Sequence, residues 1–274
     1  MYTHLQRDAS RPPVTLATLA RMKADGEKIA SLTCYDASFA VLLDAAEVDV
    51  VLVGDSLGMV IQGHDTTVPV TMDHMVYHSA AVARGLHRPF LIADLPFMSY
   101  PSAIAALEHS VRLMQEGGAK MVKLESGGKQ TEIVEFLAGH DIAVCAHVGL
   151  KPQSVHKTGG FRVQGRERDT AVRLLEEARR LEAAGADIVL LECIPAALGK
   201  AITAELHVPV IGIGAGPDTD GQILVTYDML DITTGRKPRF VRNFMAGVGD
   251  NLEALKAYVR AVKQREYPAP EHCF

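Results

Sequence analysis

The sequence has no tryptophan, only four cysteines and no surplus of positive charge. Its 28 lysine and arginine residues are outnumbered by 33 aspartate and glutamate residues spread along the chain. No broad positive field is therefore expected, which excludes nucleic acid as a partner. The cysteines form no CxxC pair of the kind that binds zinc or performs redox chemistry, and this favours a reduced, cytoplasmic protein.

Long apolar segments are also missing. The N-terminal stretch MYTHLQRDASRPP lacks the apolar core of a secretory signal, and no later run is long enough to span a bilayer. We therefore expect no membrane partner. With 48% hydrophobic residues in 274, the chain can bury a large core, and α/β barrels often reach this length as one domain. We expect one domain over 1–274, with its core at about 14–266 and flexible ends.

Short runs rich in β-branched residues alternate with longer segments of helical period, as in a parallel sheet with helical crossovers. The predicted strands are 29–35, 48–54, 89–94, 119–124, 141–147, 187–192, 208–213 and 223–226. The predicted helices are 37–46, 72–85, 101–117, 130–138, 169–184, 196–206 and 250–265, with Thr71, Ser102 and Asp169 as N-caps. Eight strands in this pattern predict a TIM (β/α)8 barrel.

Polar residues follow the predicted strands at their C-terminal ends. They are Asp36, Asp55, Ser56, Asp94, Lys123, Glu125, His147 and Glu192. In a parallel barrel these ends share one face, which carries the active site. A single acid there often only caps the next helix, the interpretation we favour for Asp36. Several acids together would raise one another's pKa unless a cation or lysine balanced them, and a divalent ion is the economical explanation.

Three of these acids, Asp55, Asp94 and Glu125, follow consecutive strands, so their oxygens could converge on one centre. A site made of oxygen ligands suits Mg²⁺, which keeps positions open for substrate oxygens. His147 could be a further ligand, although a hydrogen bond to a substrate oxygen is the role we prefer.

Such a cation could chelate a 2-oxo acid and acidify its neighbouring C–H, so that an enolate forms. Glu192, in the apolar run IVLLECIP, is the candidate base because its surroundings should raise its pKa. Alternatively, it is a helix-N-terminal carboxylate before Pro195. Lys123 shares a strand face with Glu125 and could hold the substrate, and a structural ion pair with a barrel acid is the alternative.

Two loops could serve substrate access. The GIGAG segment at 212–216 does not match G-x-G-x-x-G and is followed by Pro217, so we expect a loop that admits substrate or cofactor, not a dinucleotide site. The segment 149–168 lacks apolar periodicity and is rich in Gly, Lys and Arg. A lid and a plain surface insertion both fit this composition.

Several long motifs occur in order along the chain. They are LTCYDASFA, VGDSLGMVIQGHDTTVPVTMDHMVYH, ADLPFMSY, MVKLES, CAHVGLKPQSV with GGFRVQGR, LLECIP, PVIGIGAGPDTDGQILV and RFVRNF. Over about 14–244 the chain therefore resembles the ketopantoate hydroxymethyltransferase family. One departure is Ser126, which stands between KLE and the Gly-Gly pair that the family typically has directly afterwards.

The resemblance implies a TIM barrel of the phosphoenolpyruvate/pyruvate-like superfamily. It implies transfer of a one-carbon unit from 5,10-methylenetetrahydrofolate to 3-methyl-2-oxobutanoate, giving 2-dehydropantoate for pantothenate synthesis, with Mg²⁺ required. The family's ring-like homo-oligomers are often decamers. The site residues implied are Asp55, Asp94 and Glu125 for the metal, Asp55, Ser56, Asp94 and Lys123 for the substrate, Glu192 as proton acceptor, and His147 beside the substrate.

Two alternatives compete with this function. An enzyme of the phosphoenolpyruvate mutase and isocitrate lyase type would need a reactive cysteine in a strand-end loop, and strand alternation predicts that Cys193 points away from the face of Glu192. A metal-stabilised barrel used only as an assembly scaffold would bind no keto acid. The gathering of acids with Lys123 and His147 disfavours the scaffold.

Overall fold

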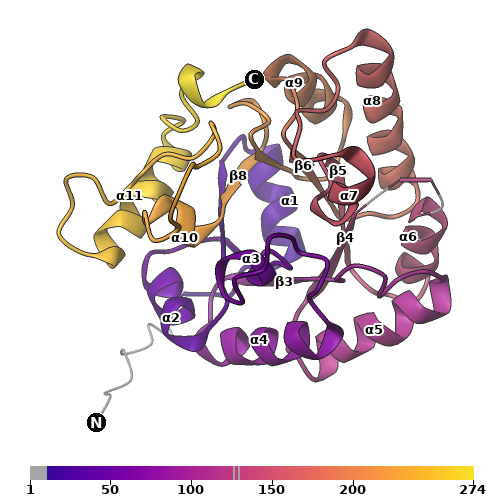
Figure 1. Cartoon of the computed structure of the whole chain (residues 1–274), viewed down its shortest axis with the longest axis horizontal. Helices are drawn as coiled ribbons and strands as arrows, with labels where there is room; N and C mark the ends of the chain where they lie inside the picture. The colour runs from indigo at the N-terminus through magenta and orange to yellow at the C-terminus, as the bar shows by residue number, and fades with distance from the viewer. Residues whose placement is uncertain (1–10, 126, 129) are drawn as a thin grey trace.

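A computed structural model describes residues 11–274 except 126 and 129. Over these residues the chain forms a closed barrel of eight parallel strands in sequence order, with the last strand paired to the first (Figure 1). The strands are β1 (Ile29–Thr33), β2 (Val50–Val53), β3 (Phe90–Asp94), β4 (Met121–Glu125), β5 (Val144–Gly149), β6 (Ile188–Glu192), β7 (Val210–Ile213) and β8 (Gly221–Leu224). The predicted (β/α)8 barrel is confirmed.

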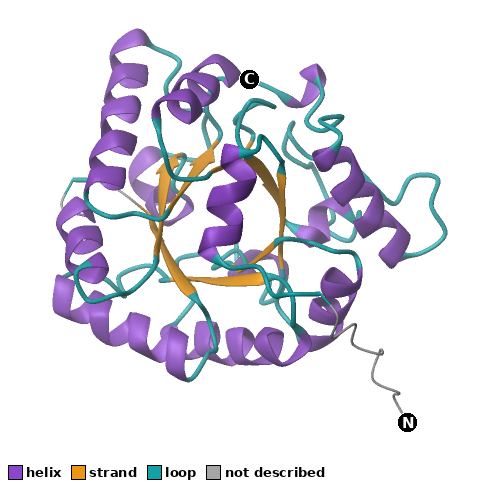
Figure 2. Cartoon of the chain, turned by 180° about the vertical axis from the view of Figure 1, so that it is seen from behind, coloured by secondary structure: helices purple, strands orange, loops and turns teal. Residues whose placement is uncertain are grey.

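Helices pack around the barrel and across one of its ends (Figure 2). They are α1 (Leu16–Ala24), α2 (Ala37–Ala45), α3 (Leu57–Val60), α4 (Met72–Gly85), α5 (Ala103–Gln115), α6 (Gln130–Ala138), α7 (Val155–Thr158), α8 (Arg168–Ala183), α9 (Ala196–Glu205), α10 (Thr226–Met229) and α11 (Asn251–Lys263), with 3₁₀ turns η1 (Pro152–Ser154) and η2 (Pro270–His272). Because helices cover the outside and side chains fill the inside, every strand residue is buried except Glu192.

The first helix closes one end of the barrel. Figure 2 shows α1 across the opening, and its Lys23 ammonium donates to Asp220, just before β8, at 2.7 Å. Neither α1 nor the short helices α3, α7 and α10 were predicted, because four-residue helices and a helix before the first strand leave little periodic pattern. With one end of the barrel covered, the opposite end, where the strands finish, is the open one.

Two of the three predicted N-caps are present in the structure. Thr71 and Ser102 cap their helices by accepting hydrogen bonds from the backbone N–H of His74 and Ala105. Asp36 caps α2 in the same way, through the N–H of Phe39 at 2.9 Å. The prediction for Asp169 was wrong: α8 already begins at Arg168, so Asp169 lies in its first turn, where its negative charge favours the helix dipole.

The C-terminal segment packs onto the barrel. The core extends past residue 266, where the sequence placed its limit, because Tyr267 is buried and Phe274 packs against the core. The backbone carbonyl of Phe274 accepts a hydrogen bond from the N–H of Ala196, at the start of α9. The chain end is thereby held near the strand ends. Among the described residues, no helix has the length and apolar character needed to cross a bilayer.

Candidate active site

A cavity of about 650 Å³ lies at the C-terminal end of the strands. All seven residues expected to form the site line it together: Asp55, Ser56, Asp94, Lys123, Glu125, His147 and Glu192. Asp36, which was assigned to a cap, does not line it. The strand-end rule therefore gathers these side chains from five strands on one face of the barrel.

A buried ion pair lies on one side of this cavity. The Lys123 ammonium lies 2.6 Å from Asp94 Oδ1, and Asp94 Oδ2 accepts the backbone N–H of Asp55 at 3.0 Å. Burial lowers the pKa of Lys123, but the carboxylates of Asp94, Asp55 and Glu125 outweigh it and raise the pKa above its usual range. Lys123 is therefore charged at neutral pH. The ion pair that was the alternative role for Lys123 is present in the structure.

The two remaining acids on this side are destabilised as anions. Burial, followed by repulsion from Asp94, raises the pKa of Asp55 to about 7. Burial and the charge of Asp55 also raise the pKa of Glu125 well above its usual value. Mutual repulsion among strand-end acids was expected from the sequence, and here it adds to the larger effect of burial on both pKa values.

Gln153, which the sequence analysis missed, joins these acids. Its side-chain amide donates to Asp55 Oδ2 at 2.8 Å, and its backbone N–H donates to Glu125 Oε1 at 3.0 Å. The Tyr100 hydroxyl donates to the Gln153 side-chain oxygen at 2.6 Å. The sequence signal was its place in the turn directly after β5, where loop residues reach the strand ends.

The acids on this side have the chemistry of a divalent-cation site. Glu125 Oε2 is buried and has no hydrogen-bond partner in the described part of the chain, and one ammonium cannot balance three carboxylates. Among residues 11–125, 127–128 and 130–274, however, no three Asp, Glu, His or Cys side chains already form a metal-ligand set. The donor set fits a hard cation such as Mg²⁺, with Gln153 holding two of the acids.

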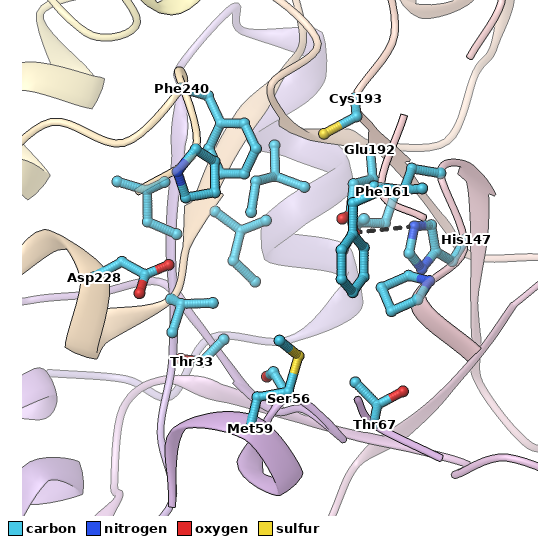
Figure 3. Close-up of a pocket in the computed structure, with 18 of the residues that line it drawn as sticks. Thr33, Ser56, Met59, Thr67, His147, Phe161, Glu192, Cys193, Asp228 and Phe240 are labelled. Carbon is cyan, nitrogen blue, oxygen red and sulfur yellow. Dashed lines mark ion pairs between the residues drawn. The ribbon is translucent and has the colours of Figure 1, made fainter. Parts of the chain in front are cut away.

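Glu192 and His147 face each other on another side of the cavity. His147 Nε2 lies 3.3 Å from Glu192 Oε2, the contact that Figure 3 marks with a dashed line. Burial, reinforced by the charge of Lys123, lowers the pKa of His147, so the imidazole is neutral at neutral pH. The Glu192 side chain is 17% exposed. Its position is thus less dry than the apolar run IVLLECIP suggested, because the strand ends at Glu192 and opens to the cavity.

Comparison with known proteins adds the family. A family model described as Ketopantoate hydroxymethyltransferase matches residues 13–270. The chain belongs to this family. A 3-methyl-2-oxobutanoate hydroxymethyltransferase of Alkalilimnicola ehrlichii is 57% identical over 97% of this chain and 96% of its own. A second one, from Nitrosococcus oceani, is 57% identical over 94% of this chain and 98% of its own.

Solved structures of other enzymes share the barrel. A putative phosphonomutase from Burkholderia cenocepacia has a TM-score of 0.62 at 17% identity, covering 79% of this chain and 94% of its own. A phosphonopyruvate hydrolase in complex with oxalate and Mg⁺⁺ has a TM-score of 0.58 at 15% identity, covering 77% of this chain and 80% of its own. At such low identity the likeness shows the fold alone. This member of the ketopantoate hydroxymethyltransferase family therefore has the same barrel fold as these enzymes.

The prediction for Cys193 was wrong. Cys193 lines the same cavity as Glu192 (Figure 3). Its φ of 48° lies in the left-handed region, so the backbone turns after β6 and strand alternation no longer applies. Burial raises the pKa of its thiol, which keeps the thiol protonated and weakly nucleophilic. The mutase alternative is therefore answered by the family match, not by the placement of the cysteines.

The two loops considered in the sequence analysis contribute differently to the cavity. The segment 149–168 contributes Phe161 and Arg162 to the cavity, so it is part of the site and not a plain surface insertion. In the GIGAG segment Ile213 lines the cavity, whereas the following glycines allow close packing: a Cβ at Gly214 would lie 2.7 Å from Phe240. The role of GIGAG in admitting substrate or cofactor stays a prediction. Ser126, where the sequence departs from the family, lies outside the described residues.

Proposed function

We propose that this protein transfers a hydroxymethyl group from 5,10-methylenetetrahydrofolate to 3-methyl-2-oxobutanoate, giving 2-dehydropantoate and tetrahydrofolate in the first step of pantothenate synthesis. The names of relatives that match almost the full chain support this activity. The observation that carries it is structural: a buried carboxylate and lysine cluster and the Glu192–His147 pair line one cavity. The methylene carbon is transferred at the oxidation level of formaldehyde, and water supplies the hydroxyl oxygen.

Asp55, Asp94 and Glu125 would hold Mg²⁺, with Ser56 and Lys123 as further contacts to the keto acid. Bound Mg²⁺ supplies a Lewis acid that polarises the keto oxygen and acidifies the C3–H bond. The raised pKa values of Asp55 and Glu125 support this assignment, because a cation would relieve the repulsion that raises them. The Gln153 amide, which donates to Asp55 Oδ2, would hold this carboxylate in position for the cation.

Glu192 would accept the C3 proton. It is the carboxylate that faces the cavity from β6 with a neutral imidazole beside it. His147 is 1% exposed, so its ring position is fixed by packing, and it would orient Glu192 and contact the keto acid. Lys123, already charged, would hold the carboxylate of the substrate or balance the developing negative charge.

We also propose a homo-oligomer, with the decamer as the size that the family resemblance implies. Large apolar side chains are exposed on two neighbouring helices: Tyr77 on α4 is 71% exposed and Ile104 on α5 is 58% exposed. Exposed apolar patches of this kind commonly mark subunit interfaces. Light scattering on the purified protein measures the assembly, and a monomer at micromolar concentration contradicts it.

Product formation tests the proposed function. Purified protein with 3-methyl-2-oxobutanoate, methylenetetrahydrofolate and Mg²⁺ should yield 2-dehydropantoate, detected by mass spectrometry, and the yield should vanish with a chelator. Titration calorimetry with the keto acid should give heat only when Mg²⁺ is present. Absence of any heat from the keto acid, with or without Mg²⁺, would instead support the scaffold alternative.

A further inference from the structure

The cavity is much larger than a small branched keto acid needs. Its volume of about 650 Å³ falls in the range that accommodates a drug-sized ligand. The residues assigned above occupy the ends of β2 to β6. The remaining wall, at β1, β7 and β8 and the loops beyond them, has no role in the proposed chemistry of the keto acid.

One buried acid on that wall is also unused. Asp228 in α10 lines the cavity and is 9% exposed. Figure 3 shows its carboxylate directed into the cavity beside Thr33, on the side away from Glu192 and His147. Apolar side chains of Ile223, Leu224 and Phe240 line the same cavity. This wall therefore offers one acceptor group on an apolar surface.

The pterin of a folate has the complementary chemistry. Its 2-amino-4-oxopyrimidine edge presents an amino group and a ring N–H side by side, and a carboxylate accepts such a pair of donors through its two oxygens. The faces of the pterin are largely apolar and suit the side chains of β8 and Phe240. Because the donor's methylene must reach the keto acid, the pterin has to lie in the same cavity.

The rim of the cavity carries positive charge. Arg162 and Arg236 line it from two different loops, and neither forms an ion pair with another residue in the described part of the chain. Two other rim cations are already engaged: Lys237 pairs with Asp231, and Arg239 donates to the carbonyl of Glu271. The two arginines are thus available for the carboxylates of a glutamate tail.

We propose that this half of the cavity is the folate subsite, in which Asp228 binds the pterin edge and Arg162 and Arg236 bind the glutamate carboxylates. The proposal rests on the proposed function, since it specifies where the one-carbon donor binds. A purely structural role for Asp228 is the alternative, because Thr233 and Lys237 lie close enough to stabilise its charge.

Asp228→Asn tests the pterin contact, with Asp218→Asn as the matched control. Asp218 is 47% exposed, pairs with Lys200 and does not line the cavity. We expect Asp228→Asn to raise KM for methylenetetrahydrofolate roughly tenfold or more, the loss expected for a hydrogen bond to a charged group. Exchange of the C3 proton of the keto acid, measured without folate, should be unchanged. Unchanged KM with intact exchange overturns the subsite, whereas absence of exchange in the wild type overturns the proposed function instead.

A change in the ligand tests the same contact in the wild-type protein. A folate analogue with methyl in place of the 2-amino group should bind the wild type at least about tenfold more weakly than the parent folate does. The affinity for this analogue should be the same in Asp228→Asn as in the wild type. Equal losses of affinity on changing the ligand, in the wild type and in Asp228→Asn, contradict the contact.

The contacts proposed for the glutamate tail are tested at the rim. The double variant Arg162→Ala with Arg236→Ala should abolish the preference for polyglutamyl over monoglutamyl folate, while Arg179→Ala, on the outer helix α8, should not. A preference retained in the rim variant contradicts the tail contacts.

Discussion

The two sides of the keto acid site differ in how their charges are balanced. On the β2 to β4 side, Asp55, Asp94 and Glu125 are almost fully buried around one lysine, and two of them have raised pKa values. On the β5 and β6 side, the partly exposed carboxylate of Glu192 lies beside the neutral imidazole of His147. In the proposed function, a cation completes the first side and the second side exchanges a proton. Binding and proton transfer can therefore be separated by mutation.

The largest expected effect is on the proton-transfer side. Glu192→Gln keeps the shape of the side chain but removes the base, so turnover should fall by roughly a hundredfold to ten-thousandfold. Affinity for Mg²⁺ and for the keto acid, measured by calorimetry, should stay near the wild-type values. Glu205→Gln, an exposed acid paired with Arg179, is the matched control. Activity close to wild type in Glu192→Gln would remove Glu192 as the base.

Removing Asp94 should damage the other side in two ways. Asp94→Ala leaves the buried ammonium of Lys123 without its partner at 2.6 Å, which should lower the free energy of unfolding by about 3 to 5 kcal/mol. It should also weaken Mg²⁺ binding. Chemical denaturation and a metal titration measure the two effects, and Asp73→Ala, an exposed acid paired with Arg112, serves as control. Unchanged metal affinity would place Asp94 outside the metal's ligands.

The acids on the β2 to β4 side also predict a pH dependence of stability. The folded state raises the pKa of Asp55 from 3.8 to about 7, so it binds the proton more tightly than the unfolded chain does. The stability from this group is greatest below pH 3.8 and declines as the pH rises to about 7. In the absence of metal, the free energy of unfolding should therefore fall less over this interval in Asp55→Asn than in the wild type. Mg²⁺ should reduce the wild-type loss, and identical profiles with and without Mg²⁺ would argue against a cation at Asp55.

The smallest expected effect comes from Gln153. Gln153→Ala removes the amide that holds Asp55 but leaves the acids themselves, so Mg²⁺ affinity should drop by about tenfold. Tyr100→Phe, which removes only the hydroxyl that donates to Gln153, should cost less. A Gln153→Ala variant that binds Mg²⁺ as tightly as the wild type would show that Gln153 has no part in positioning the acids.

These contrasts also show what the sequence could predict. The strand-end residues were predicted because parallel strands bring their ends to one face, a rule that needs only the strand order. They are Asp55, Asp94, Lys123, Glu125, His147 and Glu192. Gln153 and Asp228 were missed because their positions depend on how short turns fold after β5 and β8, and no periodic pattern encodes this. Cys193 was misplaced for the same reason: one residue with positive φ reverses the direction that alternation predicts.

The most direct test of the account is exchange of the C3 proton of 3-methyl-2-oxobutanoate in D₂O, followed by NMR with purified protein and Mg²⁺ but without folate. The two-sided site predicts exchange that requires Mg²⁺, is lost in Glu192→Gln and survives in Asp228→Asn. Absence of exchange in a folded wild-type protein that binds the keto acid would contradict the claim that the cation side and Glu192 together form the enolate.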